Sequence, residues 1–211
     1  MLVRPDEKVT IARLLTFLEH GERMAHDCAQ AQAALVDDHG SRRFLLSQAR
    51  QEAAHATVFR GAIAWLAPKH LGDTPLLPAL EEYRKLVTDA LDRRDLLESF
   101  LAEQVILEGL GEAILTRMEV GLAKRHAPFG RLRRILLHQE EAHHGFGRRR
   151  LEQAIERGDL DLPTLQHQAQ QYLALTEAMV LDLGTLFDSI GEDPTAWARD
   201  VRTFLPEWCM A

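Results

Sequence analysis

The order of apolar and polar residues along the chain predicts helices almost throughout. Apolar side chains recur every three or four residues over long stretches, and no alternating run of strand length interrupts them. Ala, Leu, Glu, Gln and Arg dominate and β-branched residues are sparse, which favours helix over strand. We therefore predict an all-α protein.

Proline, glycine and short polar stretches divide this pattern into separate helices. Ser41 is expected to begin the second helix, and "HAPFG" (126–130) to end the fourth. No linker is long or polar enough to separate two domains, so residues 1–211 are expected to form one domain. The expected helices lie at about 8–37, 41–66, 95–123 and 131–156, with further ones at about 76–92, 162–190 and 195–204.

The loop lengths predict how these helices pack. Short loops join 8–37 to 41–66 and 95–123 to 131–156, and short loops make antiparallel neighbours. The helix at 76–92 would carry the chain from one pair to the other. We therefore expect a four-helix bundle with a crossover helix, and additional C-terminal helices packed outside it.

The helix at 41–66 carries an acid and a histidine on its apolar stripe. Glu52 and His55 are three residues apart and share a face with Leu45, Gln48 and Phe59. Burying an unpaired charge is very costly, so an acid at such a position needs a partner. This pair is a candidate half of a metal site.

The helix at 131–156 repeats the pattern in the stretch "HQEEAHHGFG" (138–147). Glu140 and His143 fall on the apolar stripe, whereas Glu141 falls on a polar register and is expected to face solvent. His144 lies at the edge of the stripe. The inward positions of this helix are Leu132, Leu136, Glu140, His143, Gly147, Leu151 and Ala154.

Dinuclear carboxylate sites in helix bundles use two such pairs and one further Glu from each of the other two helices. Glu108 lies on the apolar stripe of 95–123, and Glu22 on that of 8–37. Glu19 is the alternative to Glu22, but it would place Arg23 inward at the next turn. The candidate metal ligands are therefore Glu22, Glu52, His55, Glu108, Glu140 and His143.

Four carboxylates and two neutral imidazoles carry a charge of −4, which two divalent cations would balance. Hard oxygen ligands suit iron or manganese. Without metal the carboxylates would repel one another, so metal binding should stabilise the fold. Glu112, Glu19 and His144 are additional or supporting candidates, and we assign no catalytic residue beyond the metal ligands.

The order Glu, Glu-x-x-His, Glu, Glu-x-x-His resembles the ferritin-like di-iron carboxylate superfamily. Within it, "EEAHHGFG" (140–147) and the helices that follow are most similar to the small aldehyde-deformylating oxygenases, whose fourth bundle helix reads Glu-x-x-His-x-x-Phe-Gly. The similarity in layout covers about residues 8–190. It implies a ferritin-like bundle, two iron ions or manganese in their place, O₂ as co-substrate and an external electron donor such as a ferredoxin-like protein.

These features lead us to expect an O₂-activating di-iron or iron–manganese oxidase or oxygenase that acts on a small, apolar organic substrate. Two alternatives stay open. One is a ferroxidase or iron-handling protein of the ferritin type, and the other is a tRNA-modifying hydroxylase.

Composition narrows the setting of this chemistry. The 211-residue chain has a formal net charge of −7, which argues against nucleic acid as a partner. Its two cysteines, Cys28 and Cys209, have no metal-type spacing and suggest a reducing compartment. The N-terminus shows no signal peptide and no apolar run reaches the length of a membrane span. We expect a cytoplasmic protein, and a homodimer is compatible with the sequence.

Overall fold

The regular elements of the structure are helices. The structure is a computed structural model that describes residues 4–72, 77–124, 126, 130–184, 186–187 and 192–209. No strand occurs within these ranges, so the predicted all-α class is confirmed. The elements are α1 (Lys8–Leu35), α2 (His39–Leu66), η1 (Pro68–His70), α3 (Pro78–Asp92), α4 (Leu96–Phe100), the π-helix η2 (Leu101–Leu107), α5 (Glu108–Lys124), α6 (Gly130–Arg157), α7 (Leu162–Asp182), α9 (Pro194–Thr203) and η3 (Glu207–Cys209).

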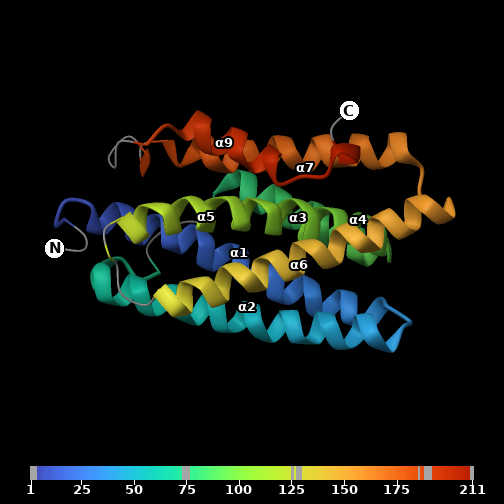
Figure 1. The fold of residues 1–211 in the computed structure, drawn as a ribbon, viewed down its shortest axis with the longest axis horizontal. Helices are drawn as coiled ribbons and strands as arrows, with labels where there is room; N and C mark the ends of the chain where they lie inside the picture. Colours follow the sequence, from blue (N-terminus) through green and yellow to red (C-terminus); the bar gives the residue numbers. More distant parts are fainter. Residues whose placement is uncertain are drawn as a thin grey trace.

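Two helix pairs form the centre of the molecule. α1 packs along α2 over most of its length, and α6 packs against α5 and η2 (Figure 1). α3 lies between the two pairs in the chain and contacts α1, α4 and α7. α7 and α9 run along the side of the bundle opposite α2 (Figure 1). The apolar core is continuous between the central pairs and these additional helices.

Side-chain caps define where several helices begin. α2 begins at His39, ahead of the expected Ser41, because the Asp38 carboxylate accepts a hydrogen bond from the Ser41 backbone N–H at 2.7 Å. Asp95 caps the start of α4 in the same way, through the backbone N–H of Glu98 at 3.0 Å. Two helical segments that contribute candidate ligands therefore start at an aspartate cap: α2, which contains Glu52, and the continuous segment α4–η2–α5, which contains Glu108.

The expected helix at 95–123 is not one uniform α-helix. Its middle, Leu101–Leu107, is a π-helix in which backbone hydrogen bonds close over five residues instead of four. The backbone N–H of Glu108 donates to the carbonyl of Glu103 in this turn. As a result, residues five apart in η2 come to lie on one face, which the α-helical period does not allow.

Gly147 allows α6 to approach this π-helix closely. A Cβ atom added at Gly147 would lie 2.4 Å from Cβ of Gln104 and 3.2 Å from its backbone carbonyl carbon. Real Cβ atoms essentially never approach another heavy atom to 2.4 Å, so any side chain here would push α6 away from η2. The glycine therefore sets the spacing between the elements that contribute Glu108, Glu140 and His143.

Some sequence predictions fall on residues outside the described ranges. These are the start of the 76–92 helix with Pro75, residues 127–129 of "HAPFG", and the end of the 162–190 helix at 188–190. The prediction that Leu132 faces the core is wrong, since this residue is 39% exposed near the start of α6.

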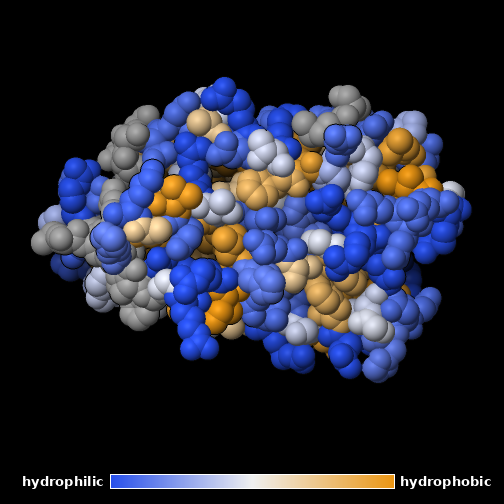
Figure 2. All heavy atoms as spheres, in the orientation of Figure 1, coloured by the Kyte–Doolittle hydropathy of each residue, from blue (hydrophilic) through white to orange (hydrophobic). Residues whose placement is uncertain are grey.

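One face of the bundle is predominantly polar (Figure 2). The face shown in Figure 2 is mostly hydrophilic, with apolar residues scattered among charged ones. Among the described residues, no helix combines the length and the apolar character needed to cross a membrane.

Replacing Gly147 by alanine should destabilise the fold. The added methyl group would clash with Gln104, and overpacking of this kind costs about 1–3 kcal/mol. Chemical denaturation, monitored by circular dichroism, measures the change in the free energy of unfolding. Gly61→Ala is the matched control, because nothing lies within 4 Å of its added Cβ. This control should stabilise the helix by about 1 kcal/mol, and an equal effect of both substitutions would contradict the close contact.

Candidate metal centre

The structure brings all six candidate ligands together in the middle of the bundle. α1 contributes Glu22, α2 contributes Glu52 and His55, and α5 begins with Glu108. α6 contributes the remaining pair. Their ligand atoms form two groups in which all atoms lie within 4.8 Å of one another: Glu22, Glu52, His55 and Glu140, and Glu52, Glu108, Glu140 and His143.

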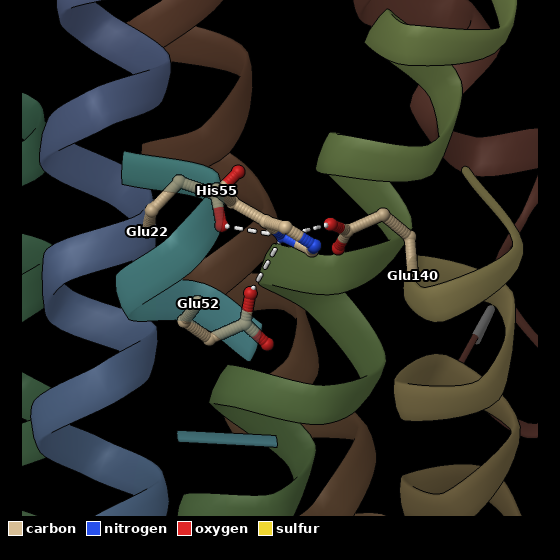
Figure 3. Close-up of side chains that lie close together, drawn as sticks. All are labelled: Glu22, Glu52, His55 and Glu140. Carbon is tan, nitrogen blue, oxygen red and sulfur yellow. Dashed lines mark hydrogen bonds and ion pairs between the residues drawn. The ribbon is translucent and has the colours of Figure 1, made fainter. Parts of the chain in front are cut away.

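The first group is centred on the imidazole of His55 (Figure 3). Its Nδ1 atom lies 3.0 Å from Glu52 Oε2, 3.0 Å from Glu140 Oε1 and 3.2 Å from Glu22 Oε2. Three helices thus direct carboxylates at one imidazole nitrogen. A ring nitrogen surrounded by carboxylate oxygens is the donor set of a hard divalent cation.

The second group is centred on His143. Its Nδ1 atom lies 2.8 Å from Glu52 Oε1 and 3.5 Å from Glu108 Oε1. Glu52 and Glu140 belong to both groups, so each can reach two neighbouring positions. These two carboxylates would therefore be able to contribute oxygens to a cation in either group.

Unsatisfied polar atoms indicate that the cluster suits metal ions. Both carboxylate oxygens of Glu52, Glu140 Oε1 and His143 Nδ1 are buried without a hydrogen-bond partner. Several of the short separations above therefore bring atoms together without hydrogen-bond geometry. Buried polar groups are nearly always hydrogen-bonded. Four neighbouring ligand atoms that lack hydrogen bonds are therefore consistent with a binding site for cations.

In the metal-free cluster, buried acids are crowded together, and this crowding raises the pKa values of several of them. Burial raises the pKa of Glu108 to about 8, and the negative charge of Glu52 adds to this shift. Burial likewise raises the pKa of Glu140 far above its usual value, with Glu108 as the next cause. Burial alone would lower the pKa of His143, but Glu108 and Glu52 outweigh it and raise that pKa to about 11. Without metal, protons are held where cations would bind.

Glutamines from the opposite helix hold the outer nitrogens of both histidines. His55 Nε2 on α2 lies 2.8 Å from Gln139 Oε1 on α6, and His143 Nε2 on α6 lies 2.7 Å from Gln51 Oε1 on α2. When Nε2–H donates to the amide oxygen, the lone pair is on Nδ1, which faces the carboxylates. Each glutamine directly precedes a candidate ligand, because the two motifs read Gln-Glu-Ala-Ala-His (51–55) and Gln-Glu-Glu-Ala-His (139–143). These glutamines are not among the residues predicted from the sequence, although the repeat is visible there.

Glu103 is a further buried acid that the sequence analysis missed. It is fully buried on η2, and Gln48 Nε2 donates to Glu103 Oε1 at 3.2 Å and to Glu108 Oε1 at 2.7 Å. Burial raises the pKa of Glu103 well above its usual value. It belongs to neither ligand group. An α-helical period places Glu103 away from Glu108, so only the π-turn brings this acid to the site.

The supporting candidates lie outside the cluster. Glu19 is held by Arg23 at 2.7 Å and by Arg60 at 3.7 Å. His144 is buried, and its Nδ1 atom lies 2.8 Å from Glu112 Oε2. Glu141 is exposed, on the solvent side of α6.

A narrow apolar pocket adjoins the carboxylates. It holds about 40 Å³ and is lined by Glu22, Glu108 and Glu140 together with apolar residues of α1, α3, η2 and α5. Gly111 lines it as well, and a Cβ added there would lie 3.7 Å from Glu140 Oε2. The missing side chain at Gly111 therefore leaves space directly beside a candidate ligand.

Fold and cluster together define a ferritin-like helical bundle with a carboxylate–histidine centre. Among solved structures, the fold is similar to that of Protein 19 with aldehyde deformylating oxidase activity from Synechococcus. The match covers 99% of this chain and 91% of that chain, with a TM-score of 0.77 and 16% sequence identity. The resemblance noted in the sequence is thus confirmed for the fold. No protein-family model matches the sequence, and a search of curated proteins finds no similar chain.

The metal-free protein should lose stability as pH rises from about 5 to 8. Glu108 has a usual pKa of 4.5 and a folded pKa of about 8, so the folded state binds its proton more tightly and loses that advantage across this range. The pKa of His143 is raised from 6.5 to about 11, so its stabilising contribution is also lost as pH rises, between about 6.5 and 11. The slope from Glu108 alone is at most about 1.4 kcal/mol per pH unit. Denaturant unfolding of chelator-treated protein at several pH values measures it.

Glu108→Gln serves as the control, since its amide does not titrate and the slope should become shallower, with the remainder coming from acids such as Glu140 and Glu103. Adding Mn²⁺ to the unmodified protein should raise the stability most at the high end of the range, because a cation competes with the protons. A metal-free protein that becomes more stable between pH 5 and 8 would contradict the crowded-acid description.

Replacing Gln139 by leucine should weaken metal binding without removing a ligand. His55 would lose the acceptor for its Nε2–H, and loss of such a supporting partner costs about 10- to 100-fold in metal affinity. Calorimetric titration with Mn²⁺ measures the affinity for the metal. His138→Ala, one residue earlier and exposed on the same helix, is the matched control and should leave the affinity unchanged.

Proposed function

We propose that the protein is an O₂-activating oxidase or oxygenase with two iron ions, or iron and manganese, held by Glu22, Glu52, His55, Glu108, Glu140 and His143. The observation that carries this proposal is the convergence of these buried side chains, with four ligand atoms left without hydrogen-bond partners. The likeness of the fold to a protein with aldehyde deformylating oxidase activity supports it.

The bound metals would supply the capacity to reduce O₂ and to oxidise an organic molecule. The chain would do the rest. Gln51 and Gln139 keep both imidazoles oriented, and the glutamates would hold the cations and neutralise their charge. The apolar walls beside Glu22 and Glu140 exclude water. An external electron donor would return the metals to their reduced state.

The pocket beside the carboxylates supports a small, apolar substrate. Phe17, Leu18 and Ile114 are among its apolar lining residues, and the candidate ligands are its polar ones. Its volume of about 40 Å³ is too small for more than a few atoms, so side chains such as Phe17 and Leu18 must move when a larger molecule enters. A medium-chain aldehyde is the first substrate to test, given the activity of the structural neighbour.

Substitutions on α6 test the ligand assignment. Glu140→Ala and His143→Ala should each lose metal and activity, because both side chains point into the cluster. Glu141→Ala, at the adjacent exposed position, should keep both. Metal analysis after anaerobic loading with Fe²⁺ gives the content, and O₂ uptake with aldehyde and a chemical reductant gives the activity.

Three results would contradict the proposal. The first is purified protein that retains no metal after anaerobic Fe²⁺ addition. The second is loss of metal in Glu141→Ala alone. The third is a large hollow shell that accumulates iron mineral, which would favour the iron-handling alternative.

A further inference from the structure

A second and much larger cavity lies on the other side of His143, between α2 and α6. It holds about 590 Å³, within the range of about 300–1,000 Å³ that is typical of small-molecule sites. α2 and α6 contact each other far less than α1 and α2 do, which leaves room for it. Phe44, Ser47, Gln48 and Gln51 form its α2 wall. Residues at helical spacing between Arg131 and His143 form the α6 wall.

The charged groups of this cavity are cationic. Arg131 and Arg134 line it, His138 lies beside them, and no acid occurs among its described lining residues. Neither of the two lining arginines makes an ion pair within the part of the chain that the structure describes. Arg133, on another face of the helix, is paired with Glu119 of α5 at 2.5 Å. In a chain with a net charge of −7, two unpaired guanidinium groups facing one cavity are a local reversal of charge.

The remaining lining is apolar at both ends and amide-rich between them. Ile135 lies next to the arginines on α6 and is 44% exposed, whereas Phe44 lies at the other end, with its ring centroid 6.2 Å from that of His143. Gln51 and Gln139 line the part between these ends. An occupant would therefore meet guanidinium groups, an apolar surface and the outer side of the histidine, and it would be separated from the carboxylates by the imidazole ring.

We propose that this cavity is a binding site for a small amphipathic organic acid. Its carboxylate would bind Arg131 and Arg134 at one end, and its apolar chain would run along Ile135 towards Phe44 at the other end. Guanidinium groups bind carboxylates through charge-assisted hydrogen bonds, and the cavity has the volume of a small-molecule site. This site is separate from the narrow pocket beside Glu22 and Glu140, and it does not require bound metal.

Calorimetry of the metal-free protein with decanoate tests the proposal. Decanoate should bind at low ionic strength and bind more weakly as salt is added. Arg131→Gln and Arg134→Gln should each weaken binding about tenfold, the low end for hydrogen bonds to charged groups because both side chains are exposed. Arg149→Gln is the matched control, since Arg149 is exposed on the same helix but does not line the cavity. It should leave the affinity unchanged.

Decanol and acetate separate the two parts of the ligand. Both should bind much more weakly than decanoate, because decanol lacks the charge and acetate lacks the apolar part. The proposal is overturned if the Arg131→Gln/Arg134→Gln double variant binds decanoate like the unmodified protein. Equal binding of decanol or of acetate would overturn it as well. Tighter binding of an acidic peptide such as hexaglutamate would point to a protein partner instead. Because the measurement uses metal-free protein, its failure leaves the proposed metal chemistry untouched, and the converse also holds.

Discussion

Four carboxylates buried at the centre of a helix bundle are the constraint on which this structure depends. Isolated charges at such a position would unfold a protein of ordinary stability, because each costs several kcal/mol to bury. Imidazole nitrogens lie about 3 Å from several of the carboxylate oxygens, and amide groups such as that of Gln48 donate hydrogen bonds to others. Several carboxylate oxygens still lack hydrogen-bond partners. Protons can satisfy these groups in part, as the raised pKa of Glu108 shows, and divalent cations would satisfy them more fully.

The backbone is adapted to hold this cluster in two places. The π-helix η2 shifts the register ahead of Glu108 and brings Glu103 onto the same face. Gly147 lets α6 press directly against this segment at Gln104. π-turns are energetically poorer than α-helix and are frequently found at functional sites. Together these two features fix the separation between the helices that contribute three of the candidate ligands.

The two cavities divide the surroundings of the cluster by chemistry. The pocket beside Glu22 and Glu140 is narrow and apolar, whereas the cavity behind His143 is wide and carries Arg131 and Arg134. A neutral, apolar molecule and an organic anion would therefore bind on different sides of the cluster. His143 and its partner Gln51 both line the wide cavity, so this cavity adjoins a candidate ligand and the group that orients it.

The sequence alone determined the helical class, the bundle layout and the inward registers that place Glu52 with His55 and Glu140 with His143 near one another. These features follow from the α-helical period, which is a local property that can be read from spacing. Only the tertiary structure revealed the π-turn at Glu103, because a change of helical period leaves no apolar pattern of its own. It also revealed the glutamine partners of the histidines and both cavities. These depend on distances between helices that are far apart in the chain, and packing sets those distances.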